Sequence, residues 1–124
     1  MGVELTLVLD RTYCLKEGSP IRAYDRLQLD PWGAGFFARL PVQPLPSGCP
    51  LDWYGDDGTV LVTKDAHDTP LTYTTAAAVV EALRDKKNAT EVVLDPTPWN
   101  KAVYALLLEL AREQPDMAIV LWWH

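Results

Sequence analysis

The chain has 124 residues, 48% of them hydrophobic and 23% charged, which is the composition of a folded globular domain and excludes a disordered segment. This length supports one hydrophobic core, so we expect a single domain over residues 1–124. The formal net charge of -6 disfavours direct binding to nucleic-acid phosphates, and the sequence has no apolar segment long enough to predict a membrane span.

The cysteines and the first residues bear on the cellular compartment. Cys14 and Cys49 lack the close spacing of a zinc site and do not suggest a disulfide framework. The first residues lack the basic segment and the apolar run of a secretory signal. We therefore expect a cytoplasmic protein, with no cofactor and no structural metal.

The N-terminal half predicts several short strands. Residues 3–9 alternate between apolar and polar positions, as in a strand that is buried on one face. Residues 12–50 are rich in proline and glycine, and the pieces at 21–24, 26–29 and 36–40 have strand-like composition between these breakers.

A proline-rich connection and a hairpin are expected in the middle of the chain. Four prolines within residues 41–50 remove backbone donors, which favours an extended surface connection over a strand. Residues 51–54 and 59–63 are strand-like and flank the turn sequence Gly-Asp-Asp-Gly at 55–58. This pattern predicts a β-hairpin.

The next predicted element is a helix that begins at Thr74 or Thr75, because a threonine hydroxyl accepts hydrogen bonds from the first free backbone amides of a helix. Apolar residues recur there at helical spacing, and the pattern ends near Asn88. The members of this apolar stripe are Ala76, Val79, Val80 and Leu83.

The C-terminal third predicts a strand, a helix and a second strand. Residues 91–94 form a short strand-like segment with two β-branched valines, Thr97 and Pro98 form a helix start, and residues 117–123 are continuously apolar. Such a β-α-β crossover is normally right-handed and parallel. The whole pattern predicts an α/β fold, with α+β as the alternative: one mixed sheet of about five or six strands, two main helices, the hairpin and this crossover.

Two groups of titratable residues are candidates for chemistry. Asp10 and Asp95 follow expected strands, and His124 follows the last one, so a parallel arrangement would bring these weak catalytic candidates to one edge of the sheet. Asp65, His67 and Asp68 would form a weak metal site or a general base, or else a solvated loop.

The five tryptophans are the remaining signal, because tryptophan is enriched at binding hot spots and also fills cores. Trp122 and Trp123 are adjacent in an expected strand and must point to opposite faces. Aromatic residues with neighbouring acids form the predicted binding surface, which comprises Trp32, Trp53, Tyr54, Asp56, Asp57 and Trp123.

Residues 51–58, 97–100 and 120–124 together resemble small accessory proteins encoded by phages and prophages. The resemblance carries no catalytic or ligand residue. It implies a setting in which small acidic proteins block or regulate a host protein.

The leading functional hypothesis is a non-catalytic module that binds a protein partner through an aromatic patch rimmed with acids. A variant of it is mimicry of nucleic acid by the acidic surface. The alternatives are a small hydrolase or metal-dependent enzyme that uses the aspartates and histidines above, and a homodimer or other structural homo-oligomer.

Overall fold

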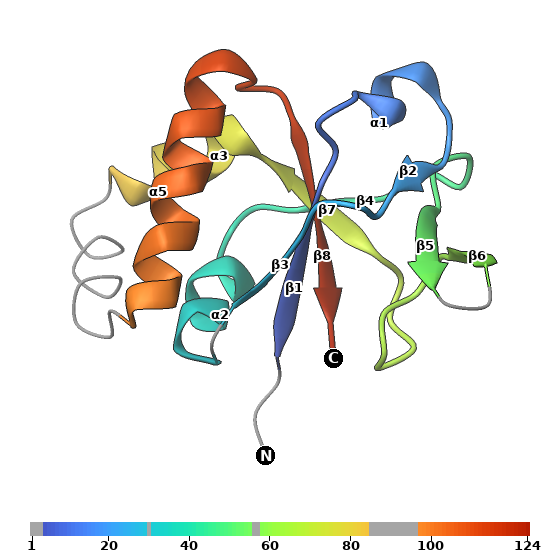
Figure 1. The fold of residues 1–124 in the computed structure, drawn as a ribbon, viewed down its shortest axis with the longest axis horizontal. Helices are drawn as coiled ribbons and strands as arrows, with labels where there is room; N and C mark the ends of the chain where they lie inside the picture. Colours follow the sequence, from blue (N-terminus) through green and yellow to red (C-terminus); the bar gives the residue numbers. More distant parts are fainter. Residues whose placement is uncertain (1–3, 30, 56–57, 85–96) are drawn as a thin grey trace.

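The computed structural model describes residues 4–29, 31–55, 58–84 and 97–124. The strands are β1 (Leu5–Leu9), β2 (Ile21–Arg22), β3 (Arg26–Leu29), β4 (Gln43–Pro44), β5 (Leu51–Gly55), β6 (Gly58–Val62), β7 (Thr72–Thr75) and β8 (Ala118–Trp123). The helices are α1 (Cys14–Glu17), α2 (Pro31–Ala38), α3 (Ala76–Leu83) and α5 (Pro98–Glu113) (Figure 1).

These elements confirm the α/β class, but the strands are divided between two sheets where one was expected. The larger sheet is antiparallel throughout and has the order β3-β1-β8-β7-β4. The smaller sheet has the order β2-β5-β6, with β2 parallel to β5 and β5 antiparallel to β6.

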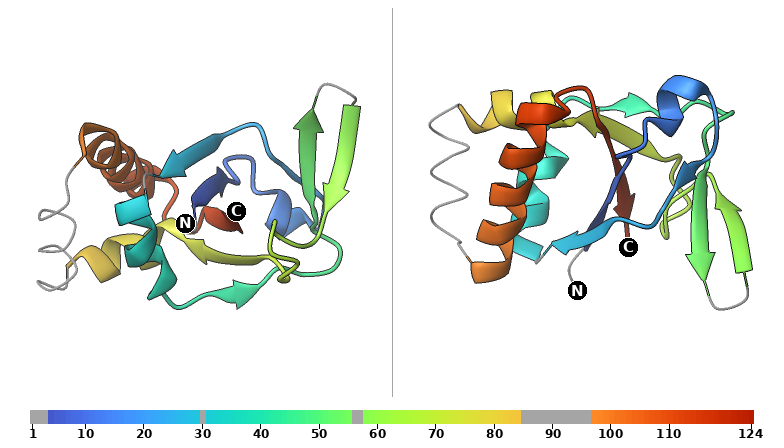
Figure 2. Two further views of the ribbon diagram at one scale, coloured as in Figure 1. Left: turned by 90° about the horizontal axis from the view of Figure 1, so that it is seen from below. Right: turned by 45° about the horizontal axis from the view of Figure 1, so that its top comes forward.

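The larger sheet lies between two layers, with helices α2, α3 and α5 at one end of the molecule and the smaller sheet at the other (Figure 2). All five residues of β1 are buried, although its alternating sequence predicts burial on one face only. Leu5, Leu7 and Leu9 belong to the core beneath the helices, and Val8 belongs to the core beneath the smaller sheet. The second layer explains the difference, because it covers the face that was expected to meet solvent.

Two helix starts match the capping signals in the sequence. The Thr75 hydroxyl accepts a hydrogen bond from the Ala78 amide at 3.2 Å, and the Thr97 hydroxyl accepts one from the Asn100 amide at 3.1 Å. The expected end of the first of these helices, near Asn88, lies outside the described residues.

The C-terminal crossover is tested only in part. Its helix and second strand are present as α5 and β8, whereas residues 91–94 lie outside the described part of the chain. Both edges of β8 are occupied, by β1 and β7, and both pairings are antiparallel.

Residues 36–40 are not a strand, and this prediction is wrong. Phe36 and Phe37 belong to α2, which begins at Pro31, a residue well suited to the first turn of a helix. The rings of Phe36 and Phe37 pack edge-to-face and stacked, respectively, against Tyr104 of α5. The two phenylalanines of this segment therefore pack as part of a helix.

The hairpin prediction is confirmed by β5 and β6, which pair from Leu51 with Val62 to Gly55 with Gly58. Gly58 has φ +102°, a backbone conformation that residues with a side chain rarely adopt. The expected extended connection over 41–50 contributes the two-residue strand β4 at the edge of the larger sheet. Among the described helices, none is long and apolar enough to cross a membrane.

Candidate interaction surface

The β5–β6 hairpin, which we call the arm, extends from the molecule at the end opposite the helices (Figure 2). Its register places Trp53 opposite Val60 on one face and Asp52 opposite Leu61 on the other. The first of these faces turns toward the larger sheet, since Trp53 packs against the core beneath the smaller sheet.

A column of stacked side chains connects the arm to the larger sheet. The Arg26 guanidinium lies 4.0 Å from the centre of the Trp53 ring, and the Trp53 and Trp122 ring centres are 4.7 Å apart. The His124 ring stacks on Trp122 with a centre-to-centre distance of 4.8 Å. Cation–π and aromatic contacts of this kind stabilise by about 1 kcal/mol each, so the column fixes the arm to β3 and β8.

The far end of the column is held at the start of β1. His124 Nε2 lies 2.8 Å from the Thr6 hydroxyl, and its Nδ1 lies 3.5 Å from the Glu4 carboxylate. The backbones of Glu4 and His124 also exchange two hydrogen bonds of 2.9 Å. Both ring nitrogens of His124 therefore face polar side chains, those of Thr6 and Glu4, at the start of β1.

The outer edge of the arm is apolar and exposed. Val60 and Leu61 point to opposite faces of β6, and each is 59% exposed. β6 is an edge strand of five residues, without a charged residue or a proline.

The other described sheet edges carry the features that normally block strand addition. β3 begins with Arg26, β4 contains Pro44, and β2 is only two residues long and includes Arg22. Short length, charge and proline all discourage pairing with another chain. Among the four described edges, β6 alone has none of these features.

Of the predicted binding residues, the structure describes the side chains of Trp53 and Trp123. Trp53 belongs to the column, whereas Trp123 is half-buried against the core beneath the helices. Trp32 lies in α2 and Tyr54 lies in β5, but their side chains are outside the description, as are both Asp56 and Asp57.

The prediction from sequence did not include Trp122 or Arg26 in the binding surface. Strand alternation already placed Trp122 on the face opposite Trp123. The contact of Trp122 with Trp53 could not be predicted, because it depends on how the two sheets are packed together.

Two residues of the proposed catalytic grouping, Asp10 and His124, lie far apart. β1 and β8 are antiparallel, so Asp10 follows the end of β1 while His124 pairs with Glu4 before its start. From Glu4 to Asp10 the chain takes six steps along β1, which at about 3.3 Å per residue amounts to about 20 Å. Asp95 lies outside the described residues.

Asp10 has a structural role that its position in the sequence did not reveal. Its side chain is 2% exposed, and its two oxygens accept hydrogen bonds from the Cys14 amide at 2.9 Å and the Leu15 amide at 3.0 Å. The carboxylate therefore holds the first turn of α1 against the end of β1.

The loop with Asp65, His67 and Asp68 is also organised by its own backbone. Asp65 Oδ1 accepts hydrogen bonds from the His67 amide at 2.8 Å and the Thr69 amide at 3.1 Å. Asp68 has φ +61° and forms an ion pair of 3.5 Å with Lys64. Within the described part of the chain, no three histidine, cysteine, aspartate or glutamate side chains lie close enough together to hold a metal ion.

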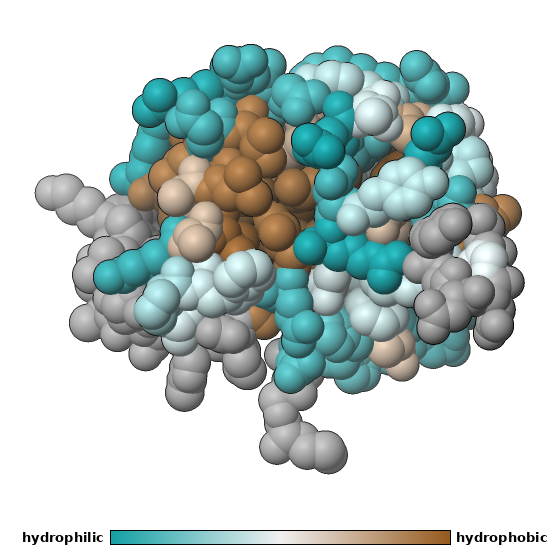
Figure 3. Space-filling view, viewed as in Figure 1, coloured by the Kyte–Doolittle hydropathy of each residue, from teal (hydrophilic) through white to brown (hydrophobic). Residues whose placement is uncertain are grey.

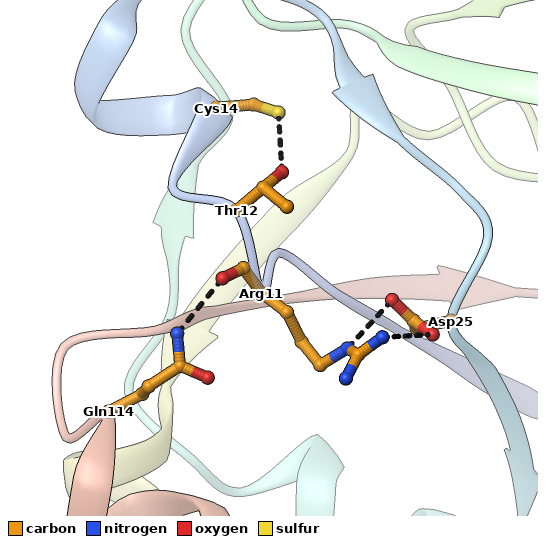
Figure 4. A network of polar contacts seen from close by, with 5 residues as sticks. All are labelled: Arg11, Thr12, Cys14, Asp25 and Gln114. Carbon is orange, nitrogen blue, oxygen red and sulfur yellow. Dashed lines mark hydrogen bonds and ion pairs between the residues drawn. The ribbon is translucent and has the colours of Figure 1, made fainter.

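A second apolar surface lies between α5 and β3, and Figure 3 shows hydrophobic residues gathered beside α5 on that face. Leu9, Leu27, Leu106 and Leu110 contribute to the lining of a hollow of about 300 Å³. Arg11 and Asp25 also line it and form an ion pair of 2.9 Å, while Gln114 donates to the Arg11 carbonyl (Figure 4).

Shifted pKa values mark structural contacts at α1 and α5. Hydrogen bonds from Lys16 and from Tyr13 hold the pKa of the Asp116 carboxyl below its usual range, and the Lys16 pKa is raised by the same bond. Burial raises the pKa of Tyr104 above the ordinary value for a tyrosine.

No protein-family model, curated protein or solved structure matches this chain.

Proposed function

We propose that this chain is a non-catalytic protein-interaction module whose partner adds an extended strand to the free edge of β6. One observation carries the proposal: β6 is a five-residue edge strand with Val60 and Leu61 each 59% exposed. Such an edge offers unpaired backbone donors and acceptors to another chain.

The arm supplies both parts of strand recognition. The backbone of β6 provides hydrogen bonds that do not depend on the partner's sequence, while Val60 and Leu61 favour apolar side chains on both faces of the added strand. The column behind β5 holds the arm in place before the partner arrives, which lowers the entropy lost on binding.

The biological setting is part of the same proposal. The resemblance to phage and prophage accessory proteins favours a host protein as the partner, which this chain would inhibit or regulate. The net charge of -6 favours association with a basic surface. Cys14 and Cys49 are free and buried, a state that the reducing cytoplasm maintains.

The enzyme alternative draws no support from the described residues, since Asp10 and His124 lie at opposite ends of β1 and Asp65 is engaged by its own loop. The homodimer alternative uses the same edge, because two copies of β6 can pair about a two-fold axis. The mass of the chain in solution separates a homodimer from a module that binds another protein.

The test uses Leu61→Lys, which places a charge on the exposed edge without altering the core. Leu106→Lys is the matched control, because Leu106 is 41% exposed on the second apolar surface. We expect wild type and Leu106→Lys to capture the same protein from host lysate and to bind the purified partner equally well. Leu61→Lys should lose at least about 10-fold in affinity while remaining folded.

Two results would contradict the proposal. The first is a partner that Leu61→Lys retains and Leu106→Lys loses, since it would place the interface on α5. The second is a wild-type dimer that Leu61→Lys converts to a monomer, because the edge would then serve self-association.

A further inference from the structure

A polar pocket lies between α1 and the smaller sheet. Its volume is about 390 Å³, and Thr12, Cys14 and Glu17 line one side of it. Arg22 of β2 and Asp52 of β5 line the other side, as neighbours in the parallel register of the two strands. Pockets of this volume are large enough for small organic ligands.

The unusual feature of the pocket is the Asp52 carboxylate. Its Oδ1 atom is shielded from solvent and has no hydrogen-bond partner within the described structure. Leaving a buried charged acceptor without a donor is costly, and native proteins rarely leave such a group unpaired. The carboxylate is therefore short of hydrogen-bond donors, and because Oδ1 is closed to solvent, a ligand in the pocket meets the carboxylate through Oδ2.

The described groups around the pocket supply no hydrogen-bond donor for Asp52, so the donor has to come from a ligand. The Thr12 hydroxyl and the Cys14 thiol lie 3.2 Å apart and are engaged with each other (Figure 4). Glu17 adds a second carboxylate at the exposed side of the pocket. The backbone amides of Cys14 and Leu15 donate to the Asp10 carboxylate, so neither amide is free to donate to Asp52.

Arg22 is the only cation among the residues that line the described pocket, and no ion pair joins it to Asp52 within the described chain. It lies beside the carboxylate as a competitor for an incoming cation. A divalent metal ion requires more oxygen ligands than Asp52 and Glu17 provide.

We infer that this pocket binds an organic cation, a primary ammonium or guanidinium group on a short aliphatic chain, with Asp52 as its main acceptor. Ammonium and guanidinium groups form short, charge-assisted hydrogen bonds with carboxylates. The aliphatic chain can be a free small amine, or it can be the lysine or arginine side chain of a protein. This inference does not depend on strand addition at β6.

The first experiment titrates agmatine and putrescine into the protein labelled with ¹⁵N and follows the amides around Asp52. We expect saturable shifts that weaken as salt is added. Asp52→Asn should lower the affinity by about 10- to 100-fold, because it removes the charged acceptor. Asp25→Asn, which neutralises an exposed acid outside the pocket, should leave the affinity unchanged.

A second variant makes the test independent of how Asp52→Asn folds. Arg22→Gln removes the competing cation and should strengthen agmatine binding several-fold. If Arg22 instead forms an ion pair with Asp52 in solution, Arg22→Gln will destabilise the protein and agmatine will not bind. That result would overturn the inference.

A pair of capped peptides decides the source of the cation. One peptide contains arginine, and the other contains its uncharged analogue citrulline at the same position. Binding of agmatine or putrescine supports a small-molecule site. Binding of the arginine peptide alone, lost in Asp52→Asn, supports an anchor site for a protein side chain. Absence of any binding that depends on Asp52, by both amines and the arginine peptide, would show that the pocket is not a cation site.

Discussion

Asp10 fixes a local fold through one buried carboxylate. The residue follows β1, and its two oxygens accept the Cys14 and Leu15 amides at the start of α1. Asp10 is 2% exposed, so these bonds are shielded from water and contribute more than similar bonds on the surface.

We expect Asp10→Asn to lower the free energy of unfolding by about 2–3 kcal/mol, because the asparagine amide group places a donor against one of the two backbone donors. Asp25→Asn is the matched control, since its ion pair with Arg11 is partly exposed and should contribute at most about 1 kcal/mol. Urea denaturation measures both values. Equal effects of the two substitutions would argue against the structural role of Asp10.

Gly58 sets the turn of the arm through its backbone conformation. Its φ of +102° disfavours any residue with a side chain, so Gly58→Ala should destabilise the protein by about 1–2 kcal/mol. Gly35 lies in α2 with open space around it, and Gly35→Ala should stabilise by about 0.5–1 kcal/mol. Thermal unfolding compares the two variants. A stable, unchanged Gly58→Ala would show that the turn does not require this conformation.

The arm and the larger sheet are coupled as elements through Trp122. Its ring lies between Trp53 of the arm and His124 at the end of the chain. Removal of this ring leaves Trp53 without its aromatic partner, with only Arg26 stacked on it, and opens a gap between the two sheets. The arm should then move independently of the larger sheet.

We expect Trp122→Ala to destabilise the protein by about 2–4 kcal/mol and to speed hydrogen exchange throughout β5 and β6. Trp99→Ala provides the control, because Trp99 is 49% exposed at the start of α5 and should cost less. Hydrogen exchange followed by mass spectrometry reports on each strand separately. Exchange in the arm that stays as slow as in wild type would rule out the coupling.

Local signals in the sequence located some elements and misplaced others. Thr75, Thr97 and Pro98 marked helix starts because capping depends on residues close together in the chain. The sequence predicts a strand over residues 36–40, although a short apolar run fits the period of a helix as well as that of a strand. Only the packing of Phe36 and Phe37 on Tyr104 decides between the two.

At the scale of the whole molecule, the order and direction of the strands determine which residues meet. A parallel arrangement of the first and last strands would have brought Asp10 and His124 together. The antiparallel pairing of β1 with β8 separates them and places His124 beneath Trp122. The α/β class was predictable from composition and pattern, whereas the aromatic column and the exposed edge of β6 depend on contacts between distant segments.

The core beneath the helices also predicts how the stability of the whole domain depends on alkaline pH. Burial raises the pKa of Tyr104 in the folded state above the value of about 10 in an unfolded chain. The unfolded state therefore loses its proton first as the pH rises, and the folded state loses stability above that value.

We expect the free energy of unfolding to fall between about pH 10 and pH 11 with a slope of up to about 1.4 kcal/mol per pH unit from this group. Tyr104→Phe should remove that part of the slope, whereas Tyr24→Phe should not, because Tyr24 is 62% exposed. Denaturation curves across this range provide the measurement. A slope that is unchanged in Tyr104→Phe would contradict the assignment to Tyr104.

Hydrogen exchange of the chain alone and in complex with its captured partner tests strand addition most directly. Alternate amides of β6 point away from β5, so an added strand should protect them while exchange in β1 and β8 stays the same. The account predicts new protection within Gly58–Val62. Unchanged exchange in β6, with protection gained on another surface, would contradict it.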